Sequence, residues 1–264
     1  MKNLSGNTAF VTGAASGIGL ALTKAFIQEG MQVVLADIEK EPLQKAVAEL
    51  EEQGHSVLGI QLDVSEEKAV QDALEKAQAH FGNVHVLCNN AGVGSVLKWE
   101  EQSYEMVQWV MNVNFGGVFH GIRTFIPHMK EHGEGGHIIN TASILGHIAA
   151  PQLGLYCASK YAVVALSESL RIELQGSGIG ISLLCPGWVV TNIMKADRHR
   201  DDTPLVDEER KAQLEEEIAQ GLTPESVALQ VVEAIKENRF YVFTNPETKP
   251  AIQARYHEII GSFI

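Results

Sequence analysis

Short runs of apolar, β-branched residues alternate along the chain with longer stretches whose apolar positions repeat at helical spacing. This alternation is typical of strands joined by crossover helices, which place the strands in one parallel sheet. Because the runs are apolar almost throughout, we expect helices to cover both faces of that sheet. The predicted strands cover residues 8–12, 32–36, 56–62, 85–89, 137–143, 179–185 and 240–243.

The stretches between the predicted strands are long enough to be helices. Helical periodicity is clearest over residues 18–29, 41–53 and 66–81, and a further long helix contains Tyr156 and runs to about Gln175. Crossovers between parallel strands are right-handed almost without exception, so these helices pack on both sides of the sheet. No linker interrupts the 264 residues, of which 45% are hydrophobic. We therefore predict a single α/β domain with a doubly wound, seven-stranded parallel sheet.

Charge and composition exclude several classes of protein. The formal net charge of −13 argues against nucleic acid as a partner. The first residues lack the apolar core of a signal peptide, and no run of about 18 apolar residues occurs, so we expect a cytoplasmic protein without a membrane span. Cys88, Cys157 and Cys185 show no C-x-x-C spacing, which predicts buried thiols and neither disulfides nor a metal site. His128 and His132 are four residues apart and able to chelate, but a solvated helix face is the favoured interpretation.

A glycine-rich segment, TGAASGIG at residues 12–19, lies between the first strand and the first helix. Glycines there let the backbone approach a pyrophosphate, and the helix N-terminus offers unpaired N–H groups to it. A plain glycine-rich turn is the alternative, and the position between strand and helix favours the dinucleotide site. The predicted cofactor-binding residues of this turn are Gly13, Ser16, Gly17, Ile18 and Gly19.

Asp37 ends the second strand, close to the spacing of about 20 residues from the glycine turn at which an acidic residue binds the adenosine ribose. A carboxylate at this position repels a 2′-phosphate. Neither Ala15 nor Ile38 offers a positive charge to neutralise one, so the sequence predicts NAD in preference to NADP. A role for Asp37 in capping the following helix is compatible with this interpretation.

Polar residues also follow the third and fourth predicted strands, at the sheet edge where ligands bind in such folds. Asp63, next to Val64, is a candidate acceptor for the adenine amino group. Asn90, in the NNAG segment that ends at Gly92, is a candidate to hold neighbouring turns together. Ordinary loop chemistry explains these residues equally well at this stage.

Three residues supply candidate acid–base chemistry. Ser143 ends the fifth predicted strand, and Tyr156 and Lys160 lie four apart on one face of the next helix. A phenol has a pKa of about 10, and a nearby ammonium favours the phenolate. Hydride transfer from an alcohol to a nicotinamide leaves a hydroxyl proton, which requires a base in hydrogen-bond reach of the substrate oxygen. We expect Tyr156 to be that base, Ser143 to hold the oxygen, and Lys160 to lower the pKa of the tyrosine and bind the nicotinamide ribose.

Taken in order, TGAASGIG, NNAG, the serine, YCASK and PGWVVT resemble the short-chain dehydrogenase/reductase superfamily in its single-domain form with a Rossmann fold. The resemblance implies B-face hydride transfer, commonly in a homotetramer. It also implies that Asn114 bends its helix and holds a water near Lys160, although Asn112 is an alternative. By the same resemblance, the nicotinamide is received by Pro186, Gly187, Val189 and Thr191.

The substrate is the least defined part of the prediction. Trp188 stands where the family often has a smaller residue, and the other candidate wall residues are Ser95, Leu145, Leu153 and Met194. These residues are mostly apolar, which favours an apolar or aromatic secondary alcohol or ketone, and core packing is the alternative for each. Alternative functions are an NADPH-type 3-oxoacyl reductase and a non-catalytic NAD(H)-sensing regulator.

Two segments lie outside the repeating pattern. Residues 191–222 are predicted to be an insertion that covers the substrate. Residues 245–264 form a tail whose end is apolar, at Ile259, Ile260, Phe263 and Ile264. Such a tail either covers the cleft or packs on another subunit, and we favour the subunit contact. The expected partners are thus a small-molecule substrate and a second copy of the chain.

Overall fold

The structure, a computed structural model, describes residues 1–194 and 208–263, including seven strands that form one parallel sheet. The strands are β1 (Thr8–Thr12), β2 (Gln32–Asp37), β3 (Val57–Gln61), β4 (Val86–Asn89), β5 (Gly136–Thr141), β6 (Ile179–Cys185) and β7 (Tyr241–Phe243). They lie in the order β3-β2-β1-β4-β5-β6-β7, and every neighbouring pair is parallel. The predicted fold class is confirmed. Ser143 lies two residues beyond the end of β5 instead of within it.

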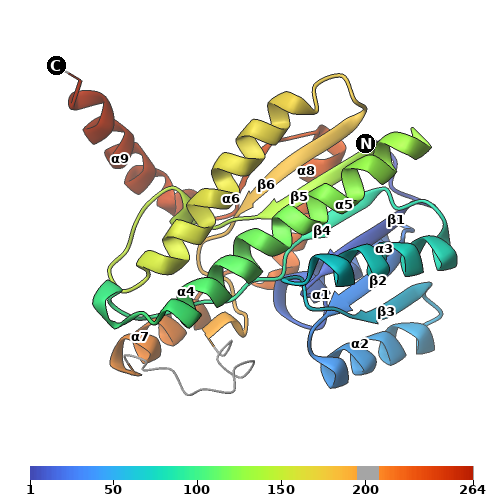
Figure 1. Cartoon of the computed structure of the whole chain (residues 1–264), viewed down its shortest axis with the longest axis horizontal. Coiled ribbons are helices and arrows are strands. Elements are labelled where there is room, and N and C mark those ends of the chain that lie inside the picture. The colour runs from blue at the N-terminus through green and yellow to red at the C-terminus, as the bar shows by residue number, and fades with distance from the viewer. Residues whose placement is uncertain (195–207, 264) are drawn as a thin grey trace.

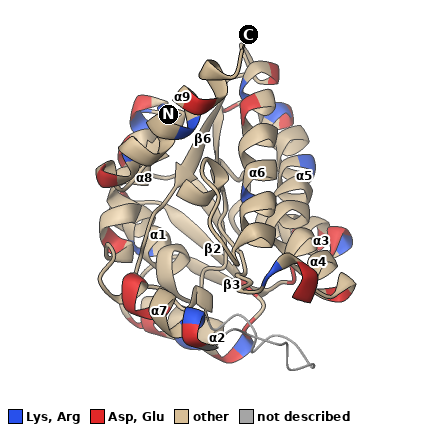
Figure 2. Ribbon diagram, turned by 90° about the vertical axis from the view of Figure 1, so that its left-hand side faces the viewer, with Lys and Arg blue, Asp and Glu red and all other residues tan. Residues whose placement is uncertain are grey.

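Helices pack on both faces of the sheet (Figures 1 and 2). The helices are α1 (Gly17–Gln28), α2 (Lys40–Glu52), α3 (Glu67–Phe81), α4 (Tyr104–Met111), α5 (Gly117–His132), α6 (Gly154–Glu173), α7 (Glu208–Ala219), α8 (Pro224–Glu237) and α9 (Lys249–Gly261). One core joins α1, α2 and α8 to the sheet, and a second joins α3, α5 and α6 to its other face. Alternate residues of β1 serve the two cores, since Ala9 and Val11 belong to the first and Phe10 to the second.

The strand order reverses direction between β1 and β4. From β1 the chain runs outward to β2 and β3, and then returns across β1 to β4. In open parallel sheets, ligands bind outside the carboxyl ends of the strands at such a reversal. This topology brings the segments that follow β1, β4, β5 and β6 to one edge of the sheet.

A π-helical turn, Asn112–Gly116, joins α4 to α5. Such turns insert an extra residue into a helix and are frequent at functional sites. Within it Asn114 is fully buried while Asn112 is exposed. The turn therefore directs Asn114 into the protein and leaves Asn112 exposed, which favours Asn114 of the two asparagines that the sequence left open.

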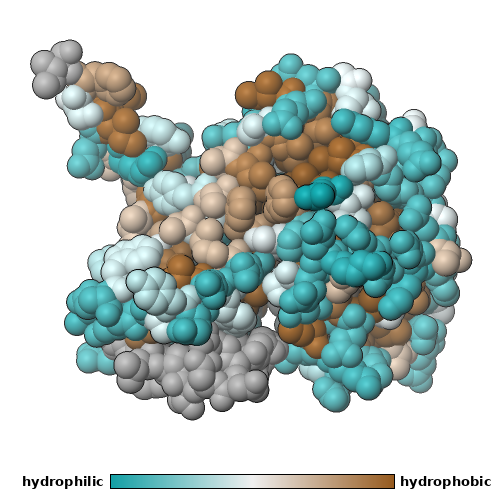
Figure 3. Space-filling view, viewed as in Figure 1, coloured by the Kyte–Doolittle hydropathy of each residue, from teal (hydrophilic) through white to brown (hydrophobic). Residues whose placement is uncertain are grey.

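The two segments outside the pattern differ in how much of them is described. Of the predicted insertion at 191–222, residues 195–207 lie outside the described residues, and its second half contains α7. In the tail, α9 stands off the body of the molecule and buries no residue (Figures 1 and 3).

All three cysteines are buried and unpaired, as expected. No helix in the described ranges has the length and apolar character needed to cross a membrane.

Candidate active site

A cavity of about 690 Å³ opens at the carboxyl edge of the sheet. Nearly all the residues that the sequence predicted for cofactor, catalysis and substrate line it. They are Gly13, Ser16, Gly17, Ile18, Asp37, Asp63, Val64, Asn90, Gly92, Ser95, Ser143, Leu145, Leu153, Tyr156, Lys160, Pro186, Gly187, Trp188, Val189, Thr191 and Met194. Gly19 and Asn114 are not in the lining and lie behind it.

The glycine turn after β1 has a backbone that side chains would not permit. Gly13 and Gly17 have φ angles of +64° and +52°, in the left-handed region that favours glycine. A Cβ on Gly19 would lie 2.0 Å from the Gly13 carbonyl oxygen, so α1 packs directly on the turn. Ser16, just before α1, makes no capping hydrogen bond with its side chain. The N-terminus of α1 thus faces the cavity, in the arrangement that binds a pyrophosphate.

Asp37 lies at the end of β2 with its side chain almost buried. One carboxylate oxygen accepts a hydrogen bond from the Ala15 N–H at 2.9 Å, and the other accepts one from the Glu39 N–H at 3.0 Å. The carboxylate therefore joins the glycine turn to the start of α2, and it also faces the cavity. Its negative charge is fixed at this wall, as discrimination against a 2′-phosphate requires.

Asn90 and Asp63 hold the neighbouring turns in place. The Asn90 Nδ2 donates to the Thr12 carbonyl at 2.9 Å, and the Asn90 N–H donates to the Thr12 hydroxyl at 2.9 Å. Asp63 Oδ1 accepts from the N–H and the hydroxyl of Ser65. Asn90 thus ties β4 to the glycine turn, and Asp63 shapes the turn after β3 while lining the cavity.

The structure brings Ser143, Tyr156 and Lys160 together at the inner end of the cavity. The Ser143 hydroxyl interacts with the Tyr156 phenol. The Lys160 Nζ lies 5.5 Å from the centre of the Tyr156 ring and donates to the Thr141 carbonyl at 2.9 Å. The serine comes from the turn after β5 and the other two from α6, so the contact between sheet and helix assembles the group.

The pKa values of the two ionisable groups differ from the expectation. Burial raises the pKa of Tyr156 to about 12, while the interaction with Ser143 lowers it by less. Burial also lowers the pKa of Lys160 to about 8. The expected lowering of the tyrosine pKa is thus not found in the free protein, because removal from water disfavours the charged form of each group. A further positive charge in the cavity would lower the Tyr156 pKa.

Asn114 lies directly behind this group and uses its amide for protein contacts. Its Oδ1 accepts from the Val93 N–H at 2.8 Å, and its Nδ2 donates to the Val93 carbonyl and the Ser159 hydroxyl, each at 2.9 Å. A Cβ on Gly92 would lie 3.3 Å from Asn114 Oδ1 and 3.4 Å from Lys160 Nζ. Asn114 therefore sits close to Lys160, and its suggested role in holding a water stays a prediction.

The outer part of the cavity is mostly apolar. Leu145 and Leu153 belong to a small core that also contacts Tyr156 and Met194. Trp188 lines the cavity and is 37% exposed. Sequence reasoning did not single out several lining residues, although most of them lie in the predicted insertion or the tail; they are Trp109, Leu214, Ile218, Asn245, Glu247 and Thr248. No motif marks them, because they come from α4, α7 and the turn after β7, which only the fold brings to the cavity.

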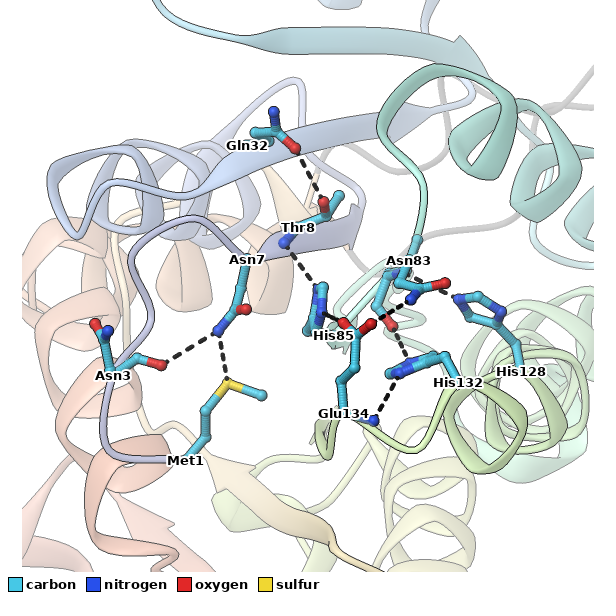
Figure 4. Close-up of polar contacts among 11 residues, drawn as sticks. Met1, Asn3, Asn7, Thr8, Gln32, Asn83, His85, His128, His132 and Glu134 are labelled. Carbon is cyan, nitrogen blue, oxygen red and sulfur yellow. Dashed lines mark hydrogen bonds and ion pairs between the residues drawn. The ribbon is translucent and has the colours of Figure 1, made fainter.

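A histidine cluster, formed by His85, His128 and His132 with Glu134, lies near the amino ends of the strands (Figure 4). This is the sheet edge opposite the cavity, which opens at the carboxyl ends. The expectation of a solvated face is wrong for His128, which is buried against the start of β4. Its Nε2 accepts the Val84 N–H at 3.0 Å, and burial lowers the pKa of the ring. Helix periodicity did not reveal this, because the partner is a backbone group of a distant segment.

His85, His132 and Glu134 in this cluster have potential metal-ligand atoms within 4.8 Å of one another. However, Nδ1 of His85 lies 3.2 Å from the Thr8 N–H, and Nδ1 of His132 lies 3.1 Å from the Glu134 N–H. Since both Nδ1 atoms accept hydrogen bonds from backbone N–H groups, each neutral ring carries its own proton on Nε2. A metal at Nε2 would displace that proton onto a nitrogen that faces an N–H donor. The cluster therefore fits a hydrogen-bonded tie between strand starts better than a metal site.

Comparison with known proteins agrees with the cavity geometry. Residues 7–202 match the family described as short chain dehydrogenase. The chain belongs to this family. A short-chain dehydrogenase/reductase from Burkholderia phymatum, solved in complex with NAD, is similar with a TM-score of 0.95 and 39% identity, over 98% of this chain and 96% of that one.

Among its relatives in the short-chain dehydrogenase family, a C alpha-dehydrogenase from a Sphingobium species is 35% identical over 268 residues, covering 99% of this chain and 88% of that protein. A 1-deoxy-11-beta-hydroxypentalenate dehydrogenase from Streptomyces exfoliatus is 34% identical over 273 residues, covering 97% and 90%. The protein is therefore an oxidoreductase of a family that uses nicotinamide cofactors.

Proposed function

We propose that this short-chain dehydrogenase transfers a hydride between NAD(H) and an apolar or aromatic secondary alcohol or its ketone. The observation that carries the proposal is the meeting of Ser143, Tyr156 and Lys160 in one cavity with the glycine turn and Asp37. The cavity lining continues from the glycine turn, where a dinucleotide would bind, to the apolar wall around Leu153, where a small molecule would lie.

Three residues around the reacting carbon have separate roles in the proton transfer. Tyr156 takes the hydroxyl proton of the alcohol, and Ser143 donates a hydrogen bond to the same oxygen as charge develops on it. Lys160, buried behind the tyrosine, stabilises the phenolate and binds ribose hydroxyls. Bound NAD would accept the hydride and add a positive charge that favours the phenolate. This charge would lower the Tyr156 pKa, which burial raises in the free protein.

Asp37 supports NAD in preference to NADP. The cavity lining includes the carboxylates of Asp37 and Asp63 at its adenosine end, and Lys160 is the one cation among the described lining residues. A 2′-phosphate would meet negative charge without compensation. The NAD complex of the Burkholderia relative is consistent with this choice.

Other parts of the proposal follow from the family. The segment that receives the nicotinamide contains Pro186, Gly187, Val189 and Thr191, all of which line the cavity. A carrier-linked 3-oxoacyl substrate is less compatible with a protein of net charge −13, since such carriers are acidic. A purely sensing role is disfavoured because Tyr156 and Lys160 are both present and in contact with the cavity. The cytoplasmic location, the covering insertion and the tail contact with a second copy stay predictions.

Substitution of the tyrosine tests the proposal. The variant Tyr156→Phe removes the proton acceptor and should lower kcat by about 10²–10⁴-fold with little change in NADH affinity. Tyr161→Phe is a matched control on the same helix, because the Tyr161 ring lies against Arg255. This substitution should leave kcat unchanged. NADH formation over a panel of apolar secondary alcohols, with NAD and NADP compared, is the measurement. Retained turnover in Tyr156→Phe contradicts the acid–base role, and better use of NADP contradicts the role of Asp37.

A further inference from the structure

One peptide group in the cavity wall is held from both sides. The carbonyl of Pro186 accepts the Ile144 N–H at 2.8 Å and lies 3.4 Å from the Ser143 hydroxyl. The N–H of Gly187 belongs to the same planar peptide and donates to Asn245 Oδ1 at 2.9 Å. Two separate elements, the turn after β5 and the turn after β7, therefore fix the orientation of this plane.

Asn245 is itself held in one orientation. Its side chain is only 6% exposed. Its Oδ1 also accepts the Thr244 hydroxyl at 2.7 Å, and its Nδ2 donates to Glu247 Oε1 at 2.7 Å. The Gly187 N–H can only donate and the ionised Glu247 carboxylate can only accept, so the two ends of the amide are not interchangeable. The hydrogen bond from the Asn245 amide is the largest cause of the lowered pKa of Glu247. The lowered pKa keeps the Glu247 carboxylate ionised.

The amide is also packed closely against the peptide that it holds. A Cβ on Gly187 would lie 2.8 Å from Asn245 Cγ and 2.9 Å from its Oδ1. The backbone carbonyl of Asn245 accepts the N–H and the hydroxyl of Thr248, at 3.1 and 2.6 Å, which fixes the turn that carries it. Asn245 and Gly187 both line the cavity. The contact therefore leaves the Pro186–Gly187 peptide little freedom to rotate.

We propose that Asn245 is a positioning residue that sets the Pro186–Gly187 peptide for the nicotinamide end of the cofactor. The inference rests on the proposed function, in which this segment receives the nicotinamide. Through the same peptide, Asn245 also supports Ser143, whose hydroxyl faces the Pro186 carbonyl. Glu247 anchors the amide from the other side. Without Asn245 the Gly187 N–H loses its acceptor, and the plane is held only at its oxygen.

Paired binding measurements separate positioning from general structure. NADH and ADP-ribose, which lacks the nicotinamide, are titrated against the full-length protein and against Asn245→Ala. We expect about tenfold weaker binding of NADH, from one lost buried hydrogen bond, and ADP-ribose affinity within about twofold of the wild type. Asn83→Ala is a matched control, because Asn83 donates to Glu134 at 2.9 Å at the far sheet edge. It should change neither affinity.

A rescue experiment tests the orientation of the amide. In the double variant Asn245→Asp, Glu247→Gln, an oxygen still accepts the Gly187 N–H, while the donor and acceptor of the second bond exchange places. NADH affinity should return to within about threefold of the wild type, whereas Asn245→Asp alone sets two carboxylates together and should not. Unchanged NADH affinity in Asn245→Ala, or equal loss of NADH and ADP-ribose, overturns the inference. A wild-type protein that binds ADP-ribose but not NADH overturns the proposed function instead.

Discussion

His137 makes a specific prediction about stability in acid. It lies on β5 with its side chain fully buried, and its Nε2 is 2.8 Å from the Ser182 hydroxyl. That hydroxyl donates its own proton to the Arg239 carbonyl at 2.6 Å, so His137 must donate from Nε2 and carry no proton on Nδ1. Nδ1 has no hydrogen-bond partner among the described residues. Protonation of this ring would therefore bury an uncompensated charge.

The size of the effect follows from the pKa. Burial, with a smaller contribution from the charge of the chain N-terminus, lowers the pKa of His137 from 6.5 to about 3. The unfolded chain therefore binds the proton at a higher pH than the folded protein, and stability falls as the pH drops below 6.5. Between pH 7 and pH 5.5, His137 alone should remove about 1.3 kcal/mol from the free energy of unfolding. Burial lowers the pKa of His128 and His147 in the same direction.

Urea denaturation at several pH values isolates the His137 contribution. The variant His137→Gln does not titrate, so the difference in unfolding free energy between wild type and variant should shrink by about 1.3 kcal/mol from pH 7 to pH 5.5. His257→Gln on exposed α9 is the control, and its curve should follow the wild type. If His137→Gln does not fold, the NMR signal of the His137 imidazole in the wild-type protein is followed instead. This signal should stay that of the neutral ring down to about pH 5. Parallel curves, or a ring that titrates near pH 6.5, would refute the reasoning.

Two further substitutions test residues that support the cavity from behind its lining. Gly19→Ala places a Cβ 2.0 Å from the Gly13 carbonyl, so the turn must shift and NADH binding, followed by fluorescence, should weaken by about tenfold or more; normal affinity would show that the turn adapts. Asn114→Leu leaves both Val93 backbone groups without their partner and should lower the free energy of unfolding in urea by about 3 kcal/mol. A loss below about 1 kcal/mol would mean that the π-helical turn relaxes around the change.

Much of the site was accessible from the sequence because its motifs are local. The glycine turn needs only the end of a strand, two glycines with left-handed φ angles and the start of a helix, all within residues 12–19. Tyr156 and Lys160 share a helix face by their spacing. Asp37 lies at the end of a strand, and the run of apolar residues in that strand marks where it ends. Once the strands are known to be parallel, their carboxyl ends must meet at one edge, which assembles these motifs without further information.

Contacts between distant segments were decided only by the tertiary structure. Asn245 gives no signal in its own neighbourhood, and its partner Gly187 is 58 residues away in the chain. Asn114 and Asn112 are alike in sequence, and a π-helical turn buries one and exposes the other. The rise in the Tyr156 pKa came from burial, which depends on everything packed around the phenol. The sequence by itself determined the fold and selected the candidate reacting groups, since short-range pattern and spacing specify both. Packing determined their environment and their supports, since burial and hydrogen-bond partners come from chain segments that meet only in the folded protein.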